Sequence, residues 1–351
     1  MKKIAIVMGH FGLKSGGVLS AVLNLVNFLS KNNYIHIYAG KENFQIPKNL
    51  KNKKNIKFTL FKISHKGFLK IPQYNFNFRD IENFDFVWFH GAYMGWNKIA
   101  KDLKNKYIYT PHGGFSNLIN VDPFRLLRRT FLFFSEYFLI KNAILVQALS
   151  QSEYSFLKKI NPNAKNIPNY IFKKKKIVYR SKKKSLCYIG RLDPSKNIPF
   201  LIKIVKKLNI VIDYYGYFTK SSSLKYKKNL KKNVSFSKNF YGSYKGQREL
   251  SKILQKYHFM LLPSKWEGMP IVIYEAIENG VIPVVSNEVK VPSFLKKFIL
   301  LIDISDLDKA TKLVKYLNSN YTKKHKLLIK NAILACQKNL NGGKYNSILD
   351  K

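Results

Sequence analysis

Two basic residues occur in a pattern that could bind a phosphorylated ligand. Arg191 and Lys196 lie five residues apart, in a turn between an apolar segment and a helical one. Arg can bind a phosphate through two parallel hydrogen bonds, while Lys supplies a point charge, so the pair suits a diphosphate. The alternative for this turn, taken alone, is a surface ion pair between Arg191 and Asp193.

Two carboxylates eight residues apart, Glu267 and Glu275, flank a turn that contains Gly268 and Pro270. Because proline lacks an N–H, Pro270 is expected to be the first residue of a helix. Glu267 then lies in the preceding loop and Glu275 on the second turn of the helix, and both can point into one cleft. In the alternative, Glu267 only complements the helix dipole and Glu275 is a solvated helix residue.

Two glycine-containing turns in the first half could also contact a ligand. Gly16 and Gly17 precede a helix that starts near Val18, and glycines allow backbone amides to approach an anion at a helix N-terminus. The dinucleotide-binding fingerprint is absent, so this turn alone is equally consistent with an ordinary first turn. His112 follows a strand, at the edge where open α/β sheets bind ligands; a structural histidine is the alternative.

Strands alternating with helices position these residues. Apolar runs of strand length occur at Ile4–Met8, Ile35–Ala39, Phe84–His90, Lys106–Thr110, Ala143–Ala148, Ser185–Ile189, Ile210–Tyr215, Phe259–Leu262 and Ile282–Val285. Helical segments occur at Val18–Leu29, Pro199–Leu208, Gln247–Tyr257 and Pro270–Asn279, and a helical tail follows Asp306. This rhythm predicts an α/β protein made of two Rossmann-like, doubly wound domains.

The predicted domains are separated by a run of charge. Residues 171–184 are rich in Lys, cannot form a core, and are expected to be an exposed basic linker. We therefore expect an N-terminal domain over residues 1–170 and a C-terminal domain with a helical tail over residues 185–351.

The composition is globular but strongly basic. The 351 residues are 46% hydrophobic, with 63 Lys+Arg against 19 Asp+Glu and a formal net charge of +44. This excludes a disordered, collagen-like or coiled-coil chain. Such a charge suggests nucleic acid, an anionic membrane or a phosphorylated ligand. Only seven of the basic residues are Arg, the residue that nucleic-acid readers use most. A Lys-rich solvated surface is therefore favoured, and no nucleic acid partner is expected.

The sequence also predicts where the protein acts. Cys187 and Cys336 lie in apolar settings without a C-x-x-C pattern, which argues against a disulfide framework or a zinc site and fits a reducing cytoplasm. No signal peptide and no spanning helix are expected.

Taken together, the motifs resemble those of the retaining glycosyltransferases of family four, which have the GT-B fold. The resemblance rests on Gly16-Gly17, His112-Gly113, Ile167-Pro168-Asn169, Gly190-Arg191-Leu192 with Lys196, and Glu267-x7-Glu275. It implies two domains that face each other across a cleft, with a nucleotide sugar bound mainly to the second.

The resemblance also implies roles for individual residues. Arg191 and Lys196 would hold the donor diphosphate, and Glu275 the ribose hydroxyls. Glu267 would hold the donor sugar together with the backbone amides around Gly268, Met269 and Pro270. From the first domain, Gly16 and Gly17 would close over the phosphates and His112 would reach the transferred sugar.

One position departs from the family pattern, and one acidic triplet could be taken for a metal site. Tyr170 follows Ile-Pro-Asn where the family usually has Gly, which leaves the turn there undefined. Asp306-Leu307-Asp308 resembles a metal-binding D-x-D, but a helical stretch follows, so capping of that helix is favoured. We expect no cofactor and no metal requirement.

The segment Asp122–Ile140 is the best candidate for the acceptor side. It places Phe124, Leu127, Phe131, Phe134 and Phe138 at helical spacing beside Arg125, Arg128 and Arg129. This pattern suits an anionic membrane surface at the inner face of the membrane; the favoured alternative is a helix that packs its aromatic face on the sheet. The expected acceptor is a glycan or a lipid-linked glycan in surface polysaccharide or lipopolysaccharide synthesis.

Two other functions remain open at this stage. One is a non-catalytic basic module that binds nucleic acid or membrane on the same scaffold. The other is a GT-B nucleotide-sugar epimerase, which would release a free sugar without an acceptor. The four charged residues of the two motifs argue against the first.

Overall fold

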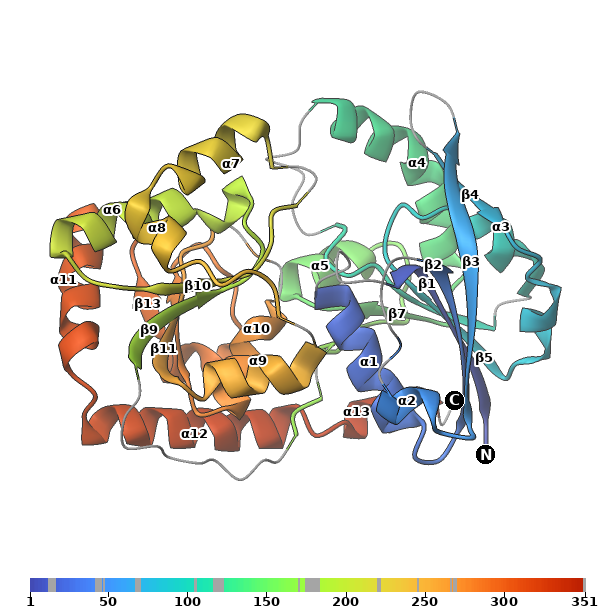
Figure 1. Ribbon diagram of the computed structural model, residues 1–351. Helices are drawn as coiled ribbons and strands as arrows, with labels where there is room; N and C mark the ends of the chain where they lie inside the picture. Colours follow the sequence, from blue (N-terminus) through green and yellow to red (C-terminus); the bar gives the residue numbers. More distant parts are fainter. Residues whose placement is uncertain are drawn as a thin grey trace. The chain divides into compact units, whose positions relative to one another are not determined.

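The protein divides into two compact units in a computed structural model (Figure 1). Unit 1 comprises Met1–Ile171 with Gly342–Lys351, and unit 2 comprises Phe172–Asn341. The structure describes residues 1–11, 17–41, 46, 48–66, 71–103, 106–115, 123–169, 171–173, 184–219, 222–244, 246–265, 267 and 270–349.

Unit 1 is built on a sheet in the strand order β4-β3-β2-β1-β5-β6-β7-β8, parallel except for the β3–β4 pair. Its strands are β1 (Lys3–Phe11), β2 (Tyr34–Lys41), β3 (Ile56–Lys66), β4 (Ile71–Asn75), β5 (Phe86–His90), β6 (Tyr107–Thr110), β7 (Leu145–Ala148) and β8 (Ala164–Asn166). Its helices are α1 (Gly17–Leu29), α2 (Lys48–Lys51), α3 (Asn97–Ala100), α4 (Pro123–Lys141), α5 (Gln151–Leu157) and α13 (Gly343–Leu349), with 3-10 turns at Arg79–Asn83 and Lys101–Leu103.

Strand β1 lies at the centre of unit 1 and is buried on both faces. Ile4 and Ile6 face a core that contains side chains of α1 and α13. Ala5 and Val7 face the opposite core, which contains side chains of α4 and α5. Burial on both faces explains why this strand is a continuous apolar run and not an alternating pattern.

Unit 2 is built on a parallel sheet in the order β10-β9-β11-β12-β13. Its strands are β9 (Lys184–Ile189), β10 (Asp213–Tyr215), β11 (Tyr257–Leu262), β12 (Ile282–Ser286) and β13 (Leu300–Ile302). Its helices are α6 (Ile198–Leu208), α7 (Leu224–Lys231), α8 (Val234–Lys238), α9 (Gly246–Leu254), α10 (Ile271–Glu278), α11 (Leu307–Ser319) and α12 (Lys323–Asn339), with 3-10 turns η4 (Pro194–Lys196) and η5 (Ser293–Phe298).

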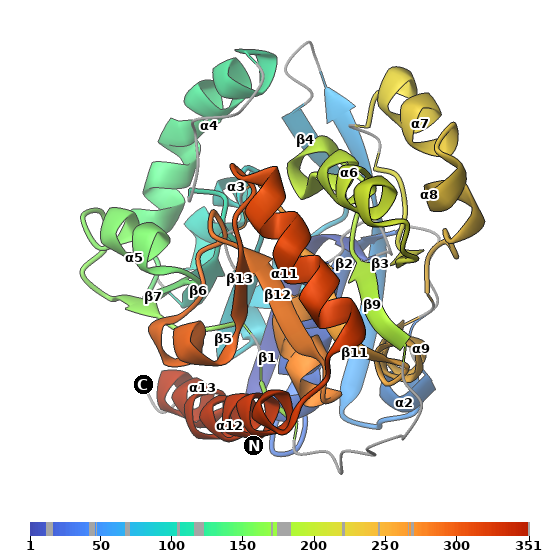
Figure 2. The same ribbon diagram turned by 90° about the vertical axis from the view of Figure 1, so that its left-hand side faces the viewer.

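Helices cover both faces of the unit 2 sheet, as Figure 2 shows. Helices α6 and α11 lie together on one side. On the other side, α9 and α10 pack Leu250, Leu254 and Ala276 against Cys187 and Ile189 of β9. Both units are therefore doubly wound α/β layers, which confirms the predicted fold class.

Each sheet reverses its strand order once. In unit 1 the chain winds outward from β1 to β3 and then returns to the other side of β1 as β5. In unit 2 it winds from β9 to β10 and then returns beside β9 as β11. Ligands in open α/β sheets bind at such switch points, beyond the carboxyl ends of the strands. The candidate sites are therefore the ends of β1 and β5 in unit 1 and of β9 and β11 in unit 2.

The structure differs from the sequence expectations at the ends of the predicted domains. The predicted C-terminal domain, residues 185–351, loses Gly342–Lys351 to unit 1, because Tyr345 and Ile348 of α13 are buried in the unit 1 core. Ile171 and Phe172, expected in an exposed linker, are 9% and 8% exposed because both are apolar and pack into a core. The charged run at 174–183 and Tyr170 lie outside the described residues.

Candidate functional site

The turn after β9 carries the first predicted cation. Asp193 caps the η4 turn by accepting a hydrogen bond from the Ser195 backbone at 3.1 Å. The Nε atom of Arg191 lies 3.5 Å from Oδ2 of Asp193, so the ion pair considered from the sequence is present. Because the Arg191 side chain is 46% exposed, this pair leaves much of the guanidinium accessible to a ligand.

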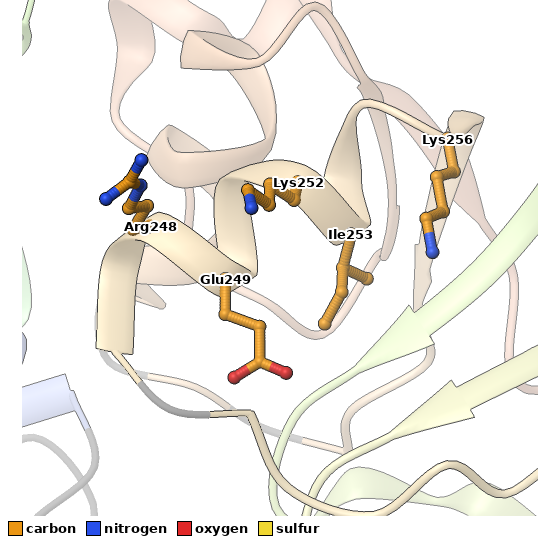
Figure 3. A pocket seen from close by; sticks show the side chains of 5 residues that line it. All are labelled: Arg248, Glu249, Lys252, Ile253 and Lys256. Carbon is orange, nitrogen blue, oxygen red and sulfur yellow. The ribbon is translucent and has the colours of Figure 1, made fainter.

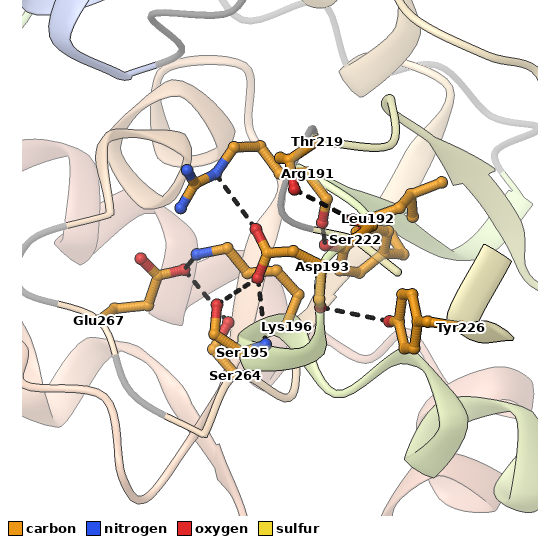
Figure 4. Close-up of polar contacts among 11 residues, drawn as sticks. Arg191, Leu192, Asp193, Ser195, Lys196, Thr219, Ser222, Tyr226, Ser264 and Glu267 are labelled. Carbon is orange, nitrogen blue, oxygen red and sulfur yellow. Dashed lines mark hydrogen bonds and ion pairs between the residues drawn. The ribbon is translucent and has the colours of Figure 1, made fainter. Parts of the chain in front are cut away.

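Backbone contacts fix this turn against its neighbours. A Cβ atom at Gly216 would lie 1.8 Å from the carbonyl oxygen of Gly190, so only glycine allows the two turns after β9 and β10 to approach so closely. The Tyr188 hydroxyl donates to the Arg191 carbonyl at 2.7 Å, and the Ser222 hydroxyl donates to the Leu192 carbonyl at 2.7 Å. The turn is therefore held from both sides (Figure 4).

Lys196 and Glu267 form a buried ion pair that joins the two strand ends at the switch point. Nζ of Lys196 donates to Oε1 of Glu267, and the Ser264 hydroxyl donates to the same oxygen at 3.1 Å. The two side chains are only 7% and 15% exposed. The Lys265 backbone donates to the Ser195 carbonyl at 2.8 Å, which ties the loop after β11 to the turn after β9. Figure 4 shows the Lys196–Glu267 contact beside Ser264, Ser195 and Asp193.

The second carboxylate lies on α10, as the sequence predicted. Glu275 is 7% exposed, so it is not the solvated helix residue of the alternative interpretation. Burial, and then the charge of Glu275, raise the pKa of Tyr244, which places the two side chains near each other. Pro270 is the N-cap and not the first helical residue, because the helix begins at Ile271. Gly268 and Met269 lie outside the described residues.

In unit 1, His112 follows β6 in a turn with left-handed backbone, φ 54°. Its Nε2 atom lies 2.9 Å from Nδ1 of His90, the last residue of β5. Burial lowers the pKa of His112 to about 3 and lowers that of His90 well below its ordinary value, so both rings are neutral at pH 7. Gly17 begins α1 beyond the end of β1, and Gly16 lies outside the described residues.

Two buried glutamates that the sequence did not single out support this edge of unit 1. Glu153 on α5 accepts a hydrogen bond from the Leu149 backbone at 3.0 Å and further ones from the backbone of Gly113 and Phe115, which hold the turn after His112. Glu136 on α4 accepts the Tyr109 hydroxyl at 2.5 Å. Burial raises the pKa of each carboxyl to about 7. For Glu153, the signal in the sequence was its place three residues after Ser150, which caps α5.

The Asp306-Leu307-Asp308 triplet is a helix cap. Asp306 accepts hydrogen bonds from the backbone of Asp308 at 3.1 Å and Lys309 at 2.9 Å, at the start of α11. In the part of the chain that the structure describes, no group of three His, Cys, Asp or Glu side chains is placed to hold a metal ion.

The outer face of α4 is aromatic and exposed. Phe131, Phe134 and Phe138 are 59%, 74% and 59% exposed, while Leu139 and Glu136 point into the unit. The favoured interpretation, in which this stripe packs on the sheet, is therefore wrong for these three residues. The side chains of Phe124, Arg125, Leu127, Arg128 and Arg129 lie outside the described set. None of the described helices is both long enough and apolar enough to cross a membrane.

A large open cavity lies elsewhere in unit 2. It measures about 650 Å³ and is lined by α9 and by Lys256, the residue before β11 (Figure 3). Lys256 marks the amino end of β11, whereas Lys196 and Glu267 lie at the carboxyl ends of the strands. Since ligands of open α/β sheets bind at carboxyl ends, the switch-point cluster is the better candidate site.

Comparisons with known proteins agree with this arrangement. Residues 170–334 match the family described as Glycosyl transferases group 1. An uncharacterized 41.2 kDa protein in the cps region of Klebsiella pneumoniae is 22% identical over 326 residues, which are 85% of this chain and 87% of that protein.

Solved structures show the same fold. HepE of Anabaena in complex with UDP and glucose is 14% identical, with a TM-score of 0.73 and all of both chains covered. Sucrose-phosphate synthase of Thermosynechococcus elongatus is 14% identical, with a TM-score of 0.72 over 100% of this chain and 98% of that one.

The two doubly wound units give this chain the GT-B fold of these structures, and its charged cluster lies at the unit 2 switch point. The segment that matches the group 1 glycosyl transferases, residues 170–334, contains Arg191, Lys196, Glu267 and Glu275.

Proposed function

We propose that this protein is a retaining glycosyltransferase of family four that moves a sugar from a nucleoside diphosphate donor to a glycan or lipid-linked glycan. The observation that carries the proposal is the convergence of Arg191, Lys196 and Glu267 at the switch point of unit 2. The relatives point the same way, since HepE was solved with UDP and glucose, and the Klebsiella protein lies in a cps region. That likeness supports a role in surface polysaccharide synthesis, and we propose lipopolysaccharide as one form of the product.

Charge explains how the site would act. When the bond between the anomeric carbon and the diphosphate oxygen breaks, the diphosphate keeps the electron pair and gains negative charge. Arg191 and Lys196 would stabilise that charge, and fixed cations in a water-poor site do this best. The acceptor hydroxyl would attack from the same face and pass its proton to the leaving phosphate, which retains the anomeric configuration. Glu275 would hold the ribose, and Glu267, with Gly268, Met269 and Pro270, the sugar.

The ion pair between Lys196 and Glu267 adds one requirement. Because Lys196 is paired with Glu267, a diphosphate must share or take over this cation when it binds. Before the diphosphate binds, the Glu267 carboxylate is the counter-ion that compensates the charge of the buried Lys196. We propose that no metal ion is needed, since two protein cations serve the diphosphate. Gly16 and Gly17 of unit 1 would complete the phosphate site.

The exposed aromatic face of α4 supports a peripheral membrane location on the cytoplasmic side. Phe131, Phe134 and Phe138 form a stripe at helical spacing on a chain with a net charge of +44. Apolar side chains on a basic protein suit an anionic bilayer surface, where a lipid-linked acceptor would lie.

The proposal is tested by transfer and by binding. UDP-, GDP- and ADP-sugars are offered with a panel of glycan acceptors, and the anomeric configuration of the product is read by NMR. Calorimetry with UDP, GDP and ADP is run in EDTA. We expect one nucleotide to bind in EDTA and a product with the donor's configuration. If no donor supports transfer, the proposed glycosyltransferase activity is wrong. An inverted product would overturn retention. Binding only after magnesium or manganese is added would overturn metal independence.

A further inference from the structure

Two histidines from neighbouring strands meet at the ligand-binding edge of unit 1. His90 ends β5, and its register partner on β6 is Thr110, two residues before His112. The left-handed backbone at His112 accompanies a contact of 2.9 Å between His112 Nε2 and His90 Nδ1. His90 is 3% exposed, whereas the His112 side chain is only partly buried. A ligand at this edge therefore meets His112, and His90 lies behind it.

The contact fixes how many protons the two rings hold. Two ring nitrogens at hydrogen-bond distance need one N–H and one lone pair between them. Burial keeps both rings neutral at pH 7, so the pair holds two N–H protons in total. One lies inside the contact, and the other lies on His90 Nε2 or on His112 Nδ1. Both outer atoms are buried, and neither has a hydrogen-bond partner within the described residues.

The two arrangements differ in where the spare N–H is left. If His112 donates to His90, the spare N–H is on His90 Nε2, behind the ring that a ligand reaches. If His90 donates to His112, the spare N–H is on His112 Nδ1 and a ligand oxygen can accept it. A buried N–H without an acceptor is costly and rare in proteins. The second arrangement is therefore favoured, because it leaves the spare N–H on the less buried of the two rings, the one nearer to an acceptor at this edge.

We propose that His90 is a positioning residue that donates to His112 Nε2 and so holds His112 as a neutral ring whose Nδ1–H faces the ligand. The ligand group is then an oxygen acceptor, such as a hydroxyl oxygen of the transferred sugar. The ligand assignment rests on the proposed function, whereas the protonation pattern of the pair does not. In a histidine, the nitrogen that carries the proton is set by the hydrogen bond at the other nitrogen.

The protonation pattern is measured directly by long-range 1H–15N spectra of the full chain labelled at its histidines, at pH 7.5. His112 is assigned from the signals lost in His112→Gln. We expect Nδ1 protonated and Nε2 unprotonated in the wild type. In His90→Asn, the amide can still donate to Nε2, so the pattern is kept. In His90→Phe, which cannot donate, the proton on His112 moves to Nε2. His36→Phe is the control, since His36 is buried on β2 and contacts Thr59; it should leave the His112 signals unchanged.

Kinetics give a second readout. With the donor found above, His90→Phe should lower kcat on the order of tenfold, the loss of about one hydrogen bond in the transition state, with little change in the donor KM. His90→Asn should restore kcat to within about twofold of the wild type, well inside that loss.

The outcomes separate the two proposals. A wild-type His112 protonated at Nε2, or a pattern that is the same in His90→Phe and the wild type, overturns the role of His90. The protonation of wild-type His112 is measured without any variant. The proposal can therefore be overturned even if His90→Phe does not fold. If no donor is turned over while the protonation pattern is as expected, the proposed function fails and the His90–His112 pairing stands.

Discussion

The ligand-facing edges of the two units use opposite kinds of polar group. In unit 2, the switch point holds a cation and a carboxylate in direct contact, Lys196 and Glu267, both largely buried. In unit 1, the corresponding edge holds two neutral rings, His90 and His112. Formal charge is therefore gathered in the unit proposed to hold the diphosphate, and uncharged donors lie in the unit proposed to reach the sugar. This matches the chemistry, because only the leaving group gains charge.

The largest expected effect comes from removing the buried cation. Lys196→Ala leaves Glu267 buried without its partner, which costs about 3–5 kcal/mol of stability for a pair of this kind. We expect a large fall in the melting temperature and loss of measurable transfer. Lys207→Ala is the matched control, because Lys207 pairs with Asp308 at the surface, with side chains 53% and 72% exposed.

A double variant separates stability from function. Lys196→Met with Glu267→Leu removes both charges and should recover much of the stability without recovering transfer. If transfer returns as well, the charged character of the unit 2 site is not needed, and the contrast with unit 1 loses its meaning.

The pH dependence of the protein's stability tests whether the buried Glu136 of unit 1 holds a proton near neutral pH. Burial raises the pKa of Glu136 from 4.5 to about 7, so between these values the folded state binds more protons than the unfolded state. Stability contributed by this group is present below pH 4.5 and is lost as pH rises through 7. Glu136→Gln abolishes this titration, so relative to the wild type it should gain up to about 3 kcal/mol between pH 4 and pH 8.

Denaturant unfolding of both proteins across that range measures the difference. The lowered pKa values of His90 and His112 act in the opposite direction, but they are common to both proteins and cancel in the comparison. Parallel stability profiles would show that Glu136 is not protonated at neutral pH.

The two glutamates of unit 2 should separate by the step they affect. A hydrogen bond to a charged group is worth about 1.5–3 kcal/mol, or roughly 10- to 100-fold. Glu275→Ala should weaken nucleoside diphosphate binding by that factor if Glu275 holds the ribose. Glu267→Ala should lower kcat instead, and it should not weaken diphosphate binding, since Lys196 is released for the phosphate. Calorimetry and kinetics on both variants decide; equal loss of binding in both would reject the assignment.

The smallest expected effect concerns the outer surface of unit 1. Replacing Phe131, Phe134 and Phe138 with Ser should release the protein from vesicles of anionic lipid and leave transfer to a soluble acceptor analogue intact. Leu327→Ser with Leu334→Ser on α12 is the control, because these side chains are 58% and 53% exposed in the other unit.

The basic residues that precede this stripe in the sequence of α4 give an independent test of the membrane proposal. Replacing Arg125, Arg128 and Arg129 with Ser should weaken binding to the vesicles by about 1 kcal/mol per residue, and by less at high salt. A steep salt dependence of binding to oligonucleotides, with vesicle sedimentation unchanged in both sets of variants, would favour the nucleic-acid-binding alternative instead.

The sequence predicted the strands near the sites well because they are buried on both faces. Strands β1, β5, β9 and β11 are largely apolar runs, and the residues that follow β1, β9 and β11 were recognised. Strand β3 was missed because it is half-buried: Ile56 and Phe61 point inward, but Lys57 and Lys66 are exposed and interrupt the pattern.

The pairings across strands could not be read from local pattern. His90 carried the same signal as His112, a histidine at the end of an apolar run, but only the adjacency of β5 and β6 brings the rings together. Likewise, Lys196 and Glu267 are separated by 71 residues, and their contact depends on the return of β11 beside β9. Short-range spacing identifies such residues; the sheet order pairs them.

The return of the chain to unit 1 after α12 has a consequence for how the protein is made. Tyr345 of α13 donates a hydrogen bond to the Pro168 carbonyl at 2.5 Å and stands in the same core as Ile4 of β1. The first unit to begin is thus the last to be completed, since residues 343–349 leave the ribosome only after every element of unit 2. Unit 2 is a single uninterrupted segment of chain, so it can fold while the core of unit 1 still lacks α13. During synthesis, the apolar surface that α13 later covers stays exposed until then and is prone to aggregation.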